Sequence, residues 1–191
     1  MASMAGDSRH RHRLTVRDYY RMAEVGILRA EAHVELIEGE IIDMAPVGSR
    51  HAGTVKQLVS LLQRAAGESA IVQVQDPISL DRYSEPQPDL ALLRWRDDYY
   101  KSGHPQSPDV LLAIEVADTS LEYDRDVKVP LYARHGVPEV WLVDVRGKRL
   151  TRYRDPVQGE YTSVDQPDLH VALGIGGFAR VRIELGAIFG E

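Results

Sequence analysis

The stretch VLLAIEV, residues 110–116, places one acidic residue, Glu115, inside an otherwise apolar run. A continuous apolar run of this length predicts a strand that is buried on both faces of a sheet. A second run of this kind, residues 90–93, directly follows Pro88 and Asp89. Two such strands favour an α/β protein whose central sheet is covered by helices on both faces.

Helical and strand patterns surround these two runs. Apolar residues spaced by three and four predict an amphipathic helix ending at Gly67, and Thr15 with Asp18 predicts a capped helix from about residue 16 to residue 24. A later helical pattern contains Pro130, which either kinks this helix or delays its start. Further strands are expected at residues 70–74, 78–80, 139–144 and 181–185, and hairpins at residues 32–44 and 149–164.

Length and composition are those of one globular domain, which we expect to span residues 14–191 after a disordered lead-in, residues 1–13. No stretch approaches the roughly 20 apolar residues that cross a bilayer, so we expect no membrane span. The chain has 0 cysteines, which excludes disulfides and thiolate metal sites and predicts a cytoplasmic protein. The net charge of −6 argues against a basic nucleic-acid binder, although a nuclease needs positive charge along one groove only.

Asp89 and Glu115 each lie at one end of a predicted buried strand. Neighbouring strands that bring two carboxylates to one place form a site for a hard cation such as Mg²⁺, which prefers oxygen ligands and keeps several waters. A buried carboxylate costs several kcal/mol unless it is paired or bound to metal. Lys128, which follows Glu115 along the chain, could supply the positive charge that phosphodiester chemistry needs, and this combination predicts a nuclease.

Each candidate residue also has a purely structural explanation. Pro-Asp before a strand is a common junction, so Asp89 could be a structural residue. Glu115 could form a salt bridge to a buried arginine, and Lys128 could face solvent. His51 and Glu35 are weaker candidates, since one could be a polar residue at a helix start and the other could point to solvent.

A series of short segments resembles the Uma family of restriction-endonuclease-like proteins, a branch of the PD-(D/E)XK nuclease superfamily. The resemblance covers about residues 15–165, and its segments follow one another in a single order. They are VELIEGE at 34–40, His51, PDL at 88–90, IEV at 114–116, Asp124, Arg125, Lys128, LYA at 131–133 and GVPEVWLVD at 136–144.

The resemblance implies a three-layer α/β/α core with a mixed central sheet, to which the predicted hairpins are added, and Mg²⁺-dependent phosphodiester cleavage, with Mn²⁺ as an alternative ion. It implies that Asp89 and Glu115 are the two metal-binding acids and that the Val116 carbonyl is a further ligand. The superfamily's lysine normally lies two residues after the second acid, where this chain has Ala117. Either Lys128 replaces that lysine, or the site is impaired.

The superfamily also has an acidic residue on its first core helix. In this chain only Glu68 lies near that helix, at its end, so His51 or Glu35 would have to substitute.

We therefore expect a metal-dependent endonuclease that acts on nucleic acid, with DNA as the substrate. The competing hypothesis is a catalytically inactive nuclease fold that serves as a binding or assembly module, which the acidic net charge and Ala117 favour. A third hypothesis is an α/β domain in which Glu115 is only salt-bridged and no metal binds. The predicted hairpin at residues 149–164 could form the contact of a homodimer.

Overall fold

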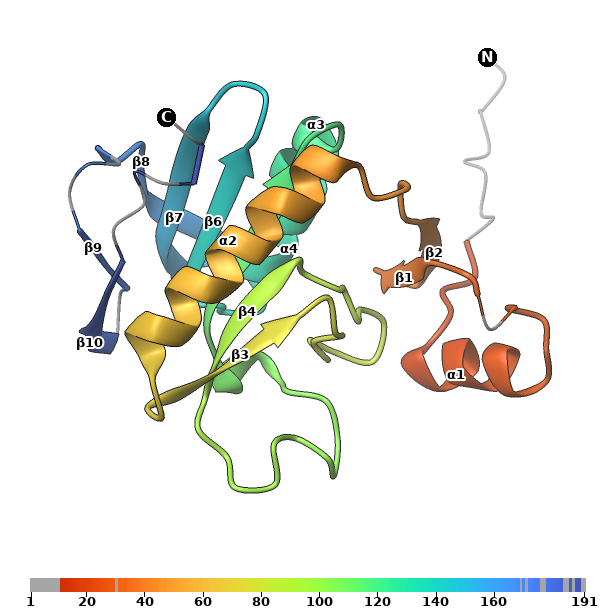
Figure 1. Cartoon of the computed structure of the whole chain (residues 1–191). Coiled ribbons are helices and arrows are strands. Elements are labelled where there is room, and N and C mark those ends of the chain that lie inside the picture. The colour runs from red at the N-terminus through yellow and green to blue at the C-terminus, as the bar shows by residue number, and fades with distance from the viewer. Residues whose placement is uncertain are drawn as a thin grey trace, which may run out of the picture.

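A mixed six-stranded sheet forms the centre of the computed structural model, which describes residues 11–29, 31–168, 170, 172–175, 178–183, 186 and 188–189 (Figure 1). The strands lie in the order β3 (Ala70–Val74), β4 (Leu90–Arg94), β5 (Val110–Ala117), β6 (Glu139–Asp144), β7 (Arg149–Val157) and β8 (Glu160–Asp165). β5 and β6 pair in parallel, and the other neighbours pair antiparallel.

The remaining elements lie around this sheet. The helical ones are α1 (Val16–Glu24), α2 (Ser49–Ala66), η1 (Ser107–Asp109), α3 (Leu121–Tyr123), η2 (Asp124–Lys128) and α4 (Val129–Arg134). Two small antiparallel pairs complete the fold, β1 (Val34–Ile37) with β2 (Glu40–Asp43), and β9 (Leu173–Ile175) with β10 (Phe178–Ile183).

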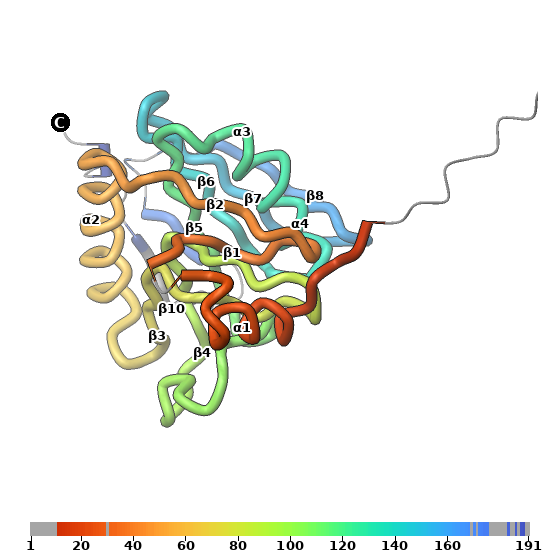
Figure 2. The backbone as a smooth tube through the Cα atoms, turned by 90° about the vertical axis from the view of Figure 1, so that its right-hand side faces the viewer, coloured from red at the N-terminus to blue at the C-terminus, as the bar shows by residue number. Residues whose placement is uncertain are grey.

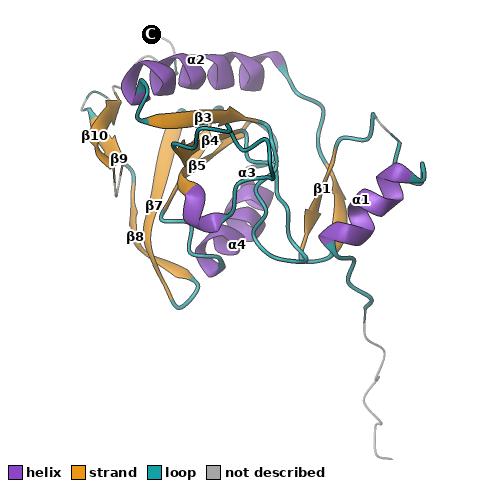
Figure 3. Cartoon of the chain, turned by 90° about the horizontal axis from the view of Figure 1, so that it is seen from below, coloured by secondary structure: helices purple, strands orange, loops and turns teal. Residues whose placement is uncertain are grey.

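Helices cover both faces of the sheet, with α2 on one side and α4 on the other (Figure 3). Alternation along β5 explains this arrangement, because successive side chains of a strand point to opposite faces. Leu112 and Ile114 pack in one core cluster with Leu58 of α2, whereas Ala113 packs in the other with Tyr132 of α4. The predicted three-layer core with a mixed sheet is confirmed.

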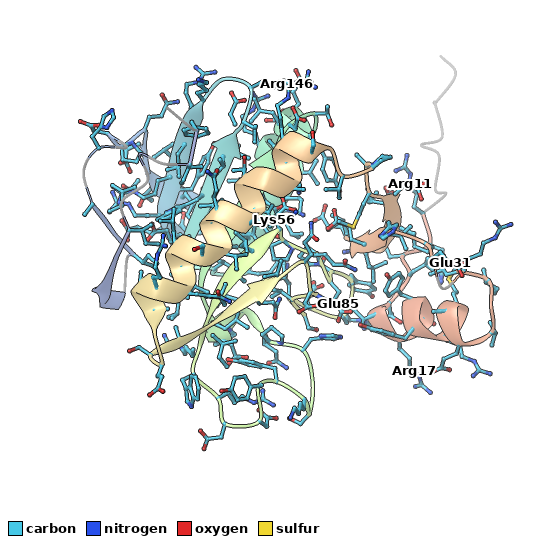
Figure 4. The ribbon with its side chains drawn as sticks, in the orientation of Figure 1. Arg11, Arg17, Glu31, Lys56, Glu85 and Arg146 are labelled. Atoms are coloured by element: carbon cyan, nitrogen blue, oxygen red, sulfur yellow. The ribbon has the colours of Figure 1, made fainter. Side chains whose placement is uncertain are left out.

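The β1–β2 hairpin and α1 lie together beside the end of the sheet (Figure 2). Thr15 and Asp18 form the predicted capping box at the start of α1. The hydroxyl of Tyr20 on α1 donates to Glu85, at 2.5 Å, and thereby ties α1 to the segment before β4, on which Figure 4 labels Glu85. This segment is in turn bridged to β1 through Leu36, so β1 is held close to the start of β4.

The helix after β5 is interrupted by a π-turn before Pro130. α3, η2 and α4 follow one another without a break, and the N–H of Val129 donates to the carbonyl of Asp124. A π-turn is one residue wider than an α-turn, which relieves the clash that a proline ring otherwise makes with the preceding turn. The α-helical part therefore begins at Val129 with Pro130 in its first turn, directly after the π-turn, and it ends before Gly136, whose φ is +72°.

One strand prediction is wrong, and a second needs an earlier start. Residues 78–80 do not form a strand, because their N–H groups donate to carbonyls of separate segments, those of Pro86, Pro105 and Ser84, so that no continuous ladder forms and Ser79 makes only an isolated bridge with Gln106. The strand expected at residues 181–185 is present as β10, which begins earlier, at Phe178; residues 184–185 lie outside the described part of the chain. The predicted lead-in falls largely on residues 1–10, which are also outside it, and the domain boundary at residue 14 stays a prediction.

The predictions for α1, α2, the β1–β2 hairpin and the β7–β8 hairpin are confirmed. Among the described residues, no helix is both long enough and apolar enough to cross a membrane.

Leu58 tests the packing of α2 on the sheet, because its side chain is 0 % exposed. We expect Leu58→Ala to lower the free energy of unfolding by about 2–5 kcal/mol, through lost burial and the cavity that remains. Leu61 is a half-buried leucine on the same helix, and Leu61→Ala is the matched control, with a clearly smaller loss. Urea unfolding measures both, and equal losses would contradict this packing.

Candidate active site

A cavity of about 380 Å³ lies where the end of β5, the start of β4 and the start of α2 meet. Four segments that are distant in sequence contribute to its lining, so the fold alone brings them together. The ionisable lining residues are Glu35, Asp43, His51, Asp89, Glu115, Asp118, Tyr123, Asp124 and Lys128. Every side chain that the sequence singled out as a candidate lies in this lining.

Asp89 extends the sheet with its side chain. β4 pairs with β5 as far as Leu90, which lies opposite Ile114. One residue earlier, the Oδ2 atom of Asp89 accepts a hydrogen bond of 2.8 Å from the backbone N–H of Val116. Its Oδ1 atom accepts a longer one of 3.3 Å from the side chain of Gln75. The carboxylate is therefore fixed at the strand end, beside the cavity.

His51 occupies the first turn of α2 and bonds to the same residue of β5. Its Nδ1 atom lies 2.8 Å from the carbonyl oxygen of Val116, which can only accept, so Nδ1 carries a proton. Its Nε2 atom lies 2.9 Å from Oδ1 of Asp89, in a direction that does not form a hydrogen bond. The Asp89 carboxylate raises the pKa of His51, against the lowering by burial.

Glu115 is 2 % exposed and lies on the face of β5 that α4 covers. One oxygen, Oε1, lies 2.8 Å from Nζ of Lys128 and accepts a hydrogen bond of 2.7 Å from the hydroxyl of Tyr132. Burial raises the pKa of Glu115, and the neighbouring carboxylates of Asp124 and Asp89 raise it further, while Lys128 opposes them. The predicted alternative of a salt bridge to arginine is thus replaced by a salt bridge to lysine.

Lys128 is 4 % exposed and links two strands. Besides Glu115, its Nζ atom lies 3.3 Å from Oε2 of Glu35 on β1 and donates to the carbonyl of Gln87, at 3.2 Å. Burial alone would lower the pKa of Lys128, but the carboxylates of Glu115, Glu35 and Asp124 outweigh burial and raise it. Lys128 is therefore a charged, buried residue of the cavity and does not face solvent.

Glu35 is held at a fixed place by β1 and by the segment before β4. Its Oε2 atom accepts a hydrogen bond of 3.0 Å from the backbone N–H of Gln87. β1 is buried along its whole length, so Glu35 points into the protein, toward Lys128, and not to solvent.

Sequence reasoning gave no role to two further residues of this region. Asp124 is 5 % exposed, lines the cavity and accepts a hydrogen bond of 2.5 Å from Ser120. Burial raises the pKa of Asp124, against the lowering by Lys128. Tyr132 reaches Glu115 from α4. Both lie four residues from Lys128, and this helical spacing was the available signal for one shared face.

Carboxylates outnumber cations in this cavity. Asp89, Glu115, Glu35 and Asp124 line the same cavity as the one ammonium of Lys128, and such an excess of negative charge favours an additional cation. The oxygen donors suit a hard divalent ion. His51 adds a buried Nε2 atom that has no hydrogen-bond partner in the described part of the chain. A histidine that binds metal through one nitrogen typically donates its other N–H to a carbonyl or carboxylate, as Nδ1 does here.

The chemistry of this donor set therefore fits a divalent metal ion. Within the residues that the structure describes, however, no three acidic or histidine side chains form a preassembled ligand group. Glu115 is turned toward Lys128 and Tyr132, and the Val116 carbonyl, expected as a ligand, already accepts from His51. A carbonyl oxygen has two lone pairs, so this contact leaves one of them free.

One solved structure with the same fold is a crystal structure of "a putative nuclease belonging to DUF820 from Anabaena variabilis ATCC 29413". The match has a TM-score of 0.70 at 17 % sequence identity, and it covers 92 % of this chain and 97 % of the other. At this identity the likeness shows a shared fold. No curated protein matches the chain.

The model of one protein family matches residues 16–179, which include every element that lines the cavity. This match covers the Asp89, Glu115 and Lys128 positions, and it agrees with the resemblance that the sequence motifs carried. The chain belongs to this family, Uma2, described as "putative restriction endonuclease".

Proposed function

We propose that this protein is a metal-dependent endonuclease that hydrolyses phosphodiester bonds in DNA. The observation that carries the proposal is the convergence of Asp89 and Glu115, from adjacent strands, with Lys128 around one cavity. Membership of a family described as restriction endonucleases supports the same activity. As the cysteine-free sequence predicted, we place this activity in the cytoplasm.

Asp89 and Glu115 are the residues that we propose hold the metal ion, Mg²⁺ or Mn²⁺, with the Val116 carbonyl or His51 Nε2 as a further donor. When bound, such an ion lowers the pKa of a water molecule and offsets the negative charge that develops on the phosphate. Asp89 is already fixed by the N–H of Val116, so little of its conformational freedom remains to be lost on binding.

Lys128 acts through charge and position in this proposal. An ammonium group has three N–H donors, and three oxygen acceptors, from Glu115, Glu35 and Gln87, lie within 3.3 Å of Nζ. Lys128 therefore holds both carboxylates in place, and its buried positive charge stabilises negative charge in the cavity. In this way it replaces the lysine that the superfamily has at the position of Ala117.

Positive charge next to the cavity offers a way to attract a phosphate backbone to an acidic protein. A second cavity, of about 590 Å³, is lined by Arg50, Arg146 and Lys148, and no acidic residue of the described part of the chain lines it. Arg146 also pairs with Asp118, at 2.8 Å, and Asp118 lines the first cavity. Figure 4 shows Arg146 near the N-terminal end of α2. We propose that these cations contact DNA phosphates beside the cleavage site.

β8 is an edge strand of the sheet, and exposed valines lie on the β7–β8 hairpin, namely Val157 and Val164, each 55 % exposed. An exposed edge with apolar side chains can pair with another chain. This feature supports the predicted homodimer contact through the hairpin.

Metal binding is the first property to measure. We expect Mn²⁺ and Mg²⁺ to bind to the wild-type protein in calorimetric titrations, and Asp89→Asn or Glu115→Gln to weaken this binding at least about 10-fold, because each removes a charged ligand. Cleavage of plasmid DNA should be lost in both variants. Glu139→Gln is the matched control, since Glu139 is a buried strand glutamate that does not line the cavity.

The metal titrations and the cleavage assay together separate the competing functions. Metal binding without cleavage of any nucleic acid would favour the inactive binding module. An absence of metal binding in the wild-type protein would contradict the proposed function and leave Glu115 as the partner of a structural salt bridge.

Lys128→Met tests the buried charge pair in metal-free buffer. Removal of the ammonium leaves Glu115 buried without its cation, which we expect to lower the free energy of unfolding by about 3–5 kcal/mol near neutral pH. Burial already raises the folded-state pKa of Glu115 in the wild type, and the variant raises it further, so the loss should grow with pH once the wild-type carboxylate is ionised, over a series from about pH 5 to about pH 8. Urea unfolding across this pH series measures it, with exposed Lys101→Met as control. A loss that does not depend on pH would contradict the electrostatic explanation.

The double variant Arg50→Ala/Lys148→Ala tests the proposed phosphate contacts. We expect weaker binding of a fluorescein-labelled DNA duplex in EDTA, and a salt dependence of the binding constant that is shallower by about 1 for each lost contact. Fluorescence anisotropy over a series of KCl concentrations measures both. Arg17→Ala/Lys101→Ala removes the same charge at exposed positions outside this cavity. Equal effects in both double variants would show that only net charge matters.

A further inference from the structure

Tyr132 and Lys128 both bind to the same oxygen of Glu115. The hydroxyl of Tyr132 donates to Oε1 at 2.7 Å, and Nζ of Lys128 lies 2.8 Å from the same atom. Both of these contacts are made on Oε1, and Glu115 also lines the cavity. One side of this carboxylate is thus occupied by the protein, and the other is available to a ligand.

The position of the Tyr132 hydroxyl is set by packing of its ring. Tyr132 is 0 % exposed, and its ring packs in the core cluster that includes Val129, Ala113 and Val140. The ring therefore cannot follow Glu115 if that side chain moves. Burial and the carboxylate of Glu115 raise the pKa of Tyr132 well above its ordinary value, so the hydroxyl keeps its proton and remains a donor.

A carboxylate on a strand can rotate about its side-chain bonds, and a metal ligand has to be held in one orientation to bind well. Lys128 holds Oε1 mainly through its charge, because an ammonium is a compact point charge and constrains the direction of a carboxylate less than a hydroxyl on a packed ring does. A tyrosine hydroxyl on a packed ring provides one donor at one place. The two contacts together define which oxygen faces α4 and which faces the cavity.

We propose that Tyr132 is a positioning residue of the site, whose hydroxyl holds Oε1 of Glu115 and thereby presents Oε2 to the metal ion. This proposal rests on the proposed function, because it needs a metal ion at Glu115. It assigns Tyr132 no contact with the substrate. Its action is on the orientation of one ligand, and it should appear as a change in metal affinity.

Tyr132→Phe removes the hydroxyl and keeps the ring. We expect it to weaken Mn²⁺ binding about 10- to 100-fold in calorimetric titrations, the usual effect of losing a hydrogen bond to a metal ligand. Tyr161→Phe is the matched control, since the Tyr161 hydroxyl also donates to a partner in the protein, the carbonyl of Val137 at 2.7 Å, at a position outside the cavity. Thermal unfolding checks that both variants fold, and Tyr161→Phe should bind Mn²⁺ as the wild type does.

A crystal structure of the wild-type protein with Mn²⁺ is the second measurement, and it needs no variant. We expect the ion on Oε2 of Glu115 while the Tyr132 hydroxyl stays on Oε1. Unchanged Mn²⁺ affinity in Tyr132→Phe, or an ion bound through Oε1 in place of the hydroxyl, would overturn the positioning role alone. Failure of the wild-type protein to bind Mn²⁺ would instead contradict the proposed function.

Discussion

The buried contact of Lys128 with Glu115 and Glu35 is the interaction on which the rest of the site depends. Three separate elements, β5, β1 and η2, supply these residues, and their burial leaves little water to screen the charges. A buried charge without a partner is strongly destabilising. The three elements are therefore held in a fixed relation, and the β1–β2 hairpin, a separate two-stranded sheet, contributes Glu35 to the site.

The π-turn makes this contact compatible with the chain. Pro130 lies at the start of α4 and would clash with a regular preceding turn. The wider turn of η2 accommodates the proline and keeps Asp124 and Lys128 buried at its two ends. A local irregularity that belongs to a proline thus brings a carboxylate and an ammonium into the cavity, and Tyr132 follows one turn later on α4.

Much of the fold was predictable from periodicity, because the runs around Glu115 and Asp89 have one explanation as buried strands. A role for the two carboxylates was predictable for the same reason, since an acidic side chain in or beside a buried strand needs a partner. The roles of Asp124 and Tyr132 were not, because in sequence one belongs to a charged cluster and the other to an apolar run. Their importance depends on how η2 and α4 face β5, which is a tertiary property. The strand wrongly predicted at residues 78–80 has the same cause. Apolar character alone does not determine whether a segment pairs continuously with one neighbouring strand.

The proposed replacement of the superfamily's lysine by Lys128 has a geometric basis. Ala117 lies on the same face of β5 as Glu115 and is 1 % exposed, so a lysine there would approach the carboxylate from along its own strand. Lys128 instead approaches from the helical layer that covers this face, which lets one ammonium contact β1 and β5 together. Such a contact exists only where the helix packs against β5. With the lysine on the helix, the positive charge reaches Glu115 only when the helical layer packs against the sheet. A lysine on β5 would instead bring its charge to Glu115 from the same strand.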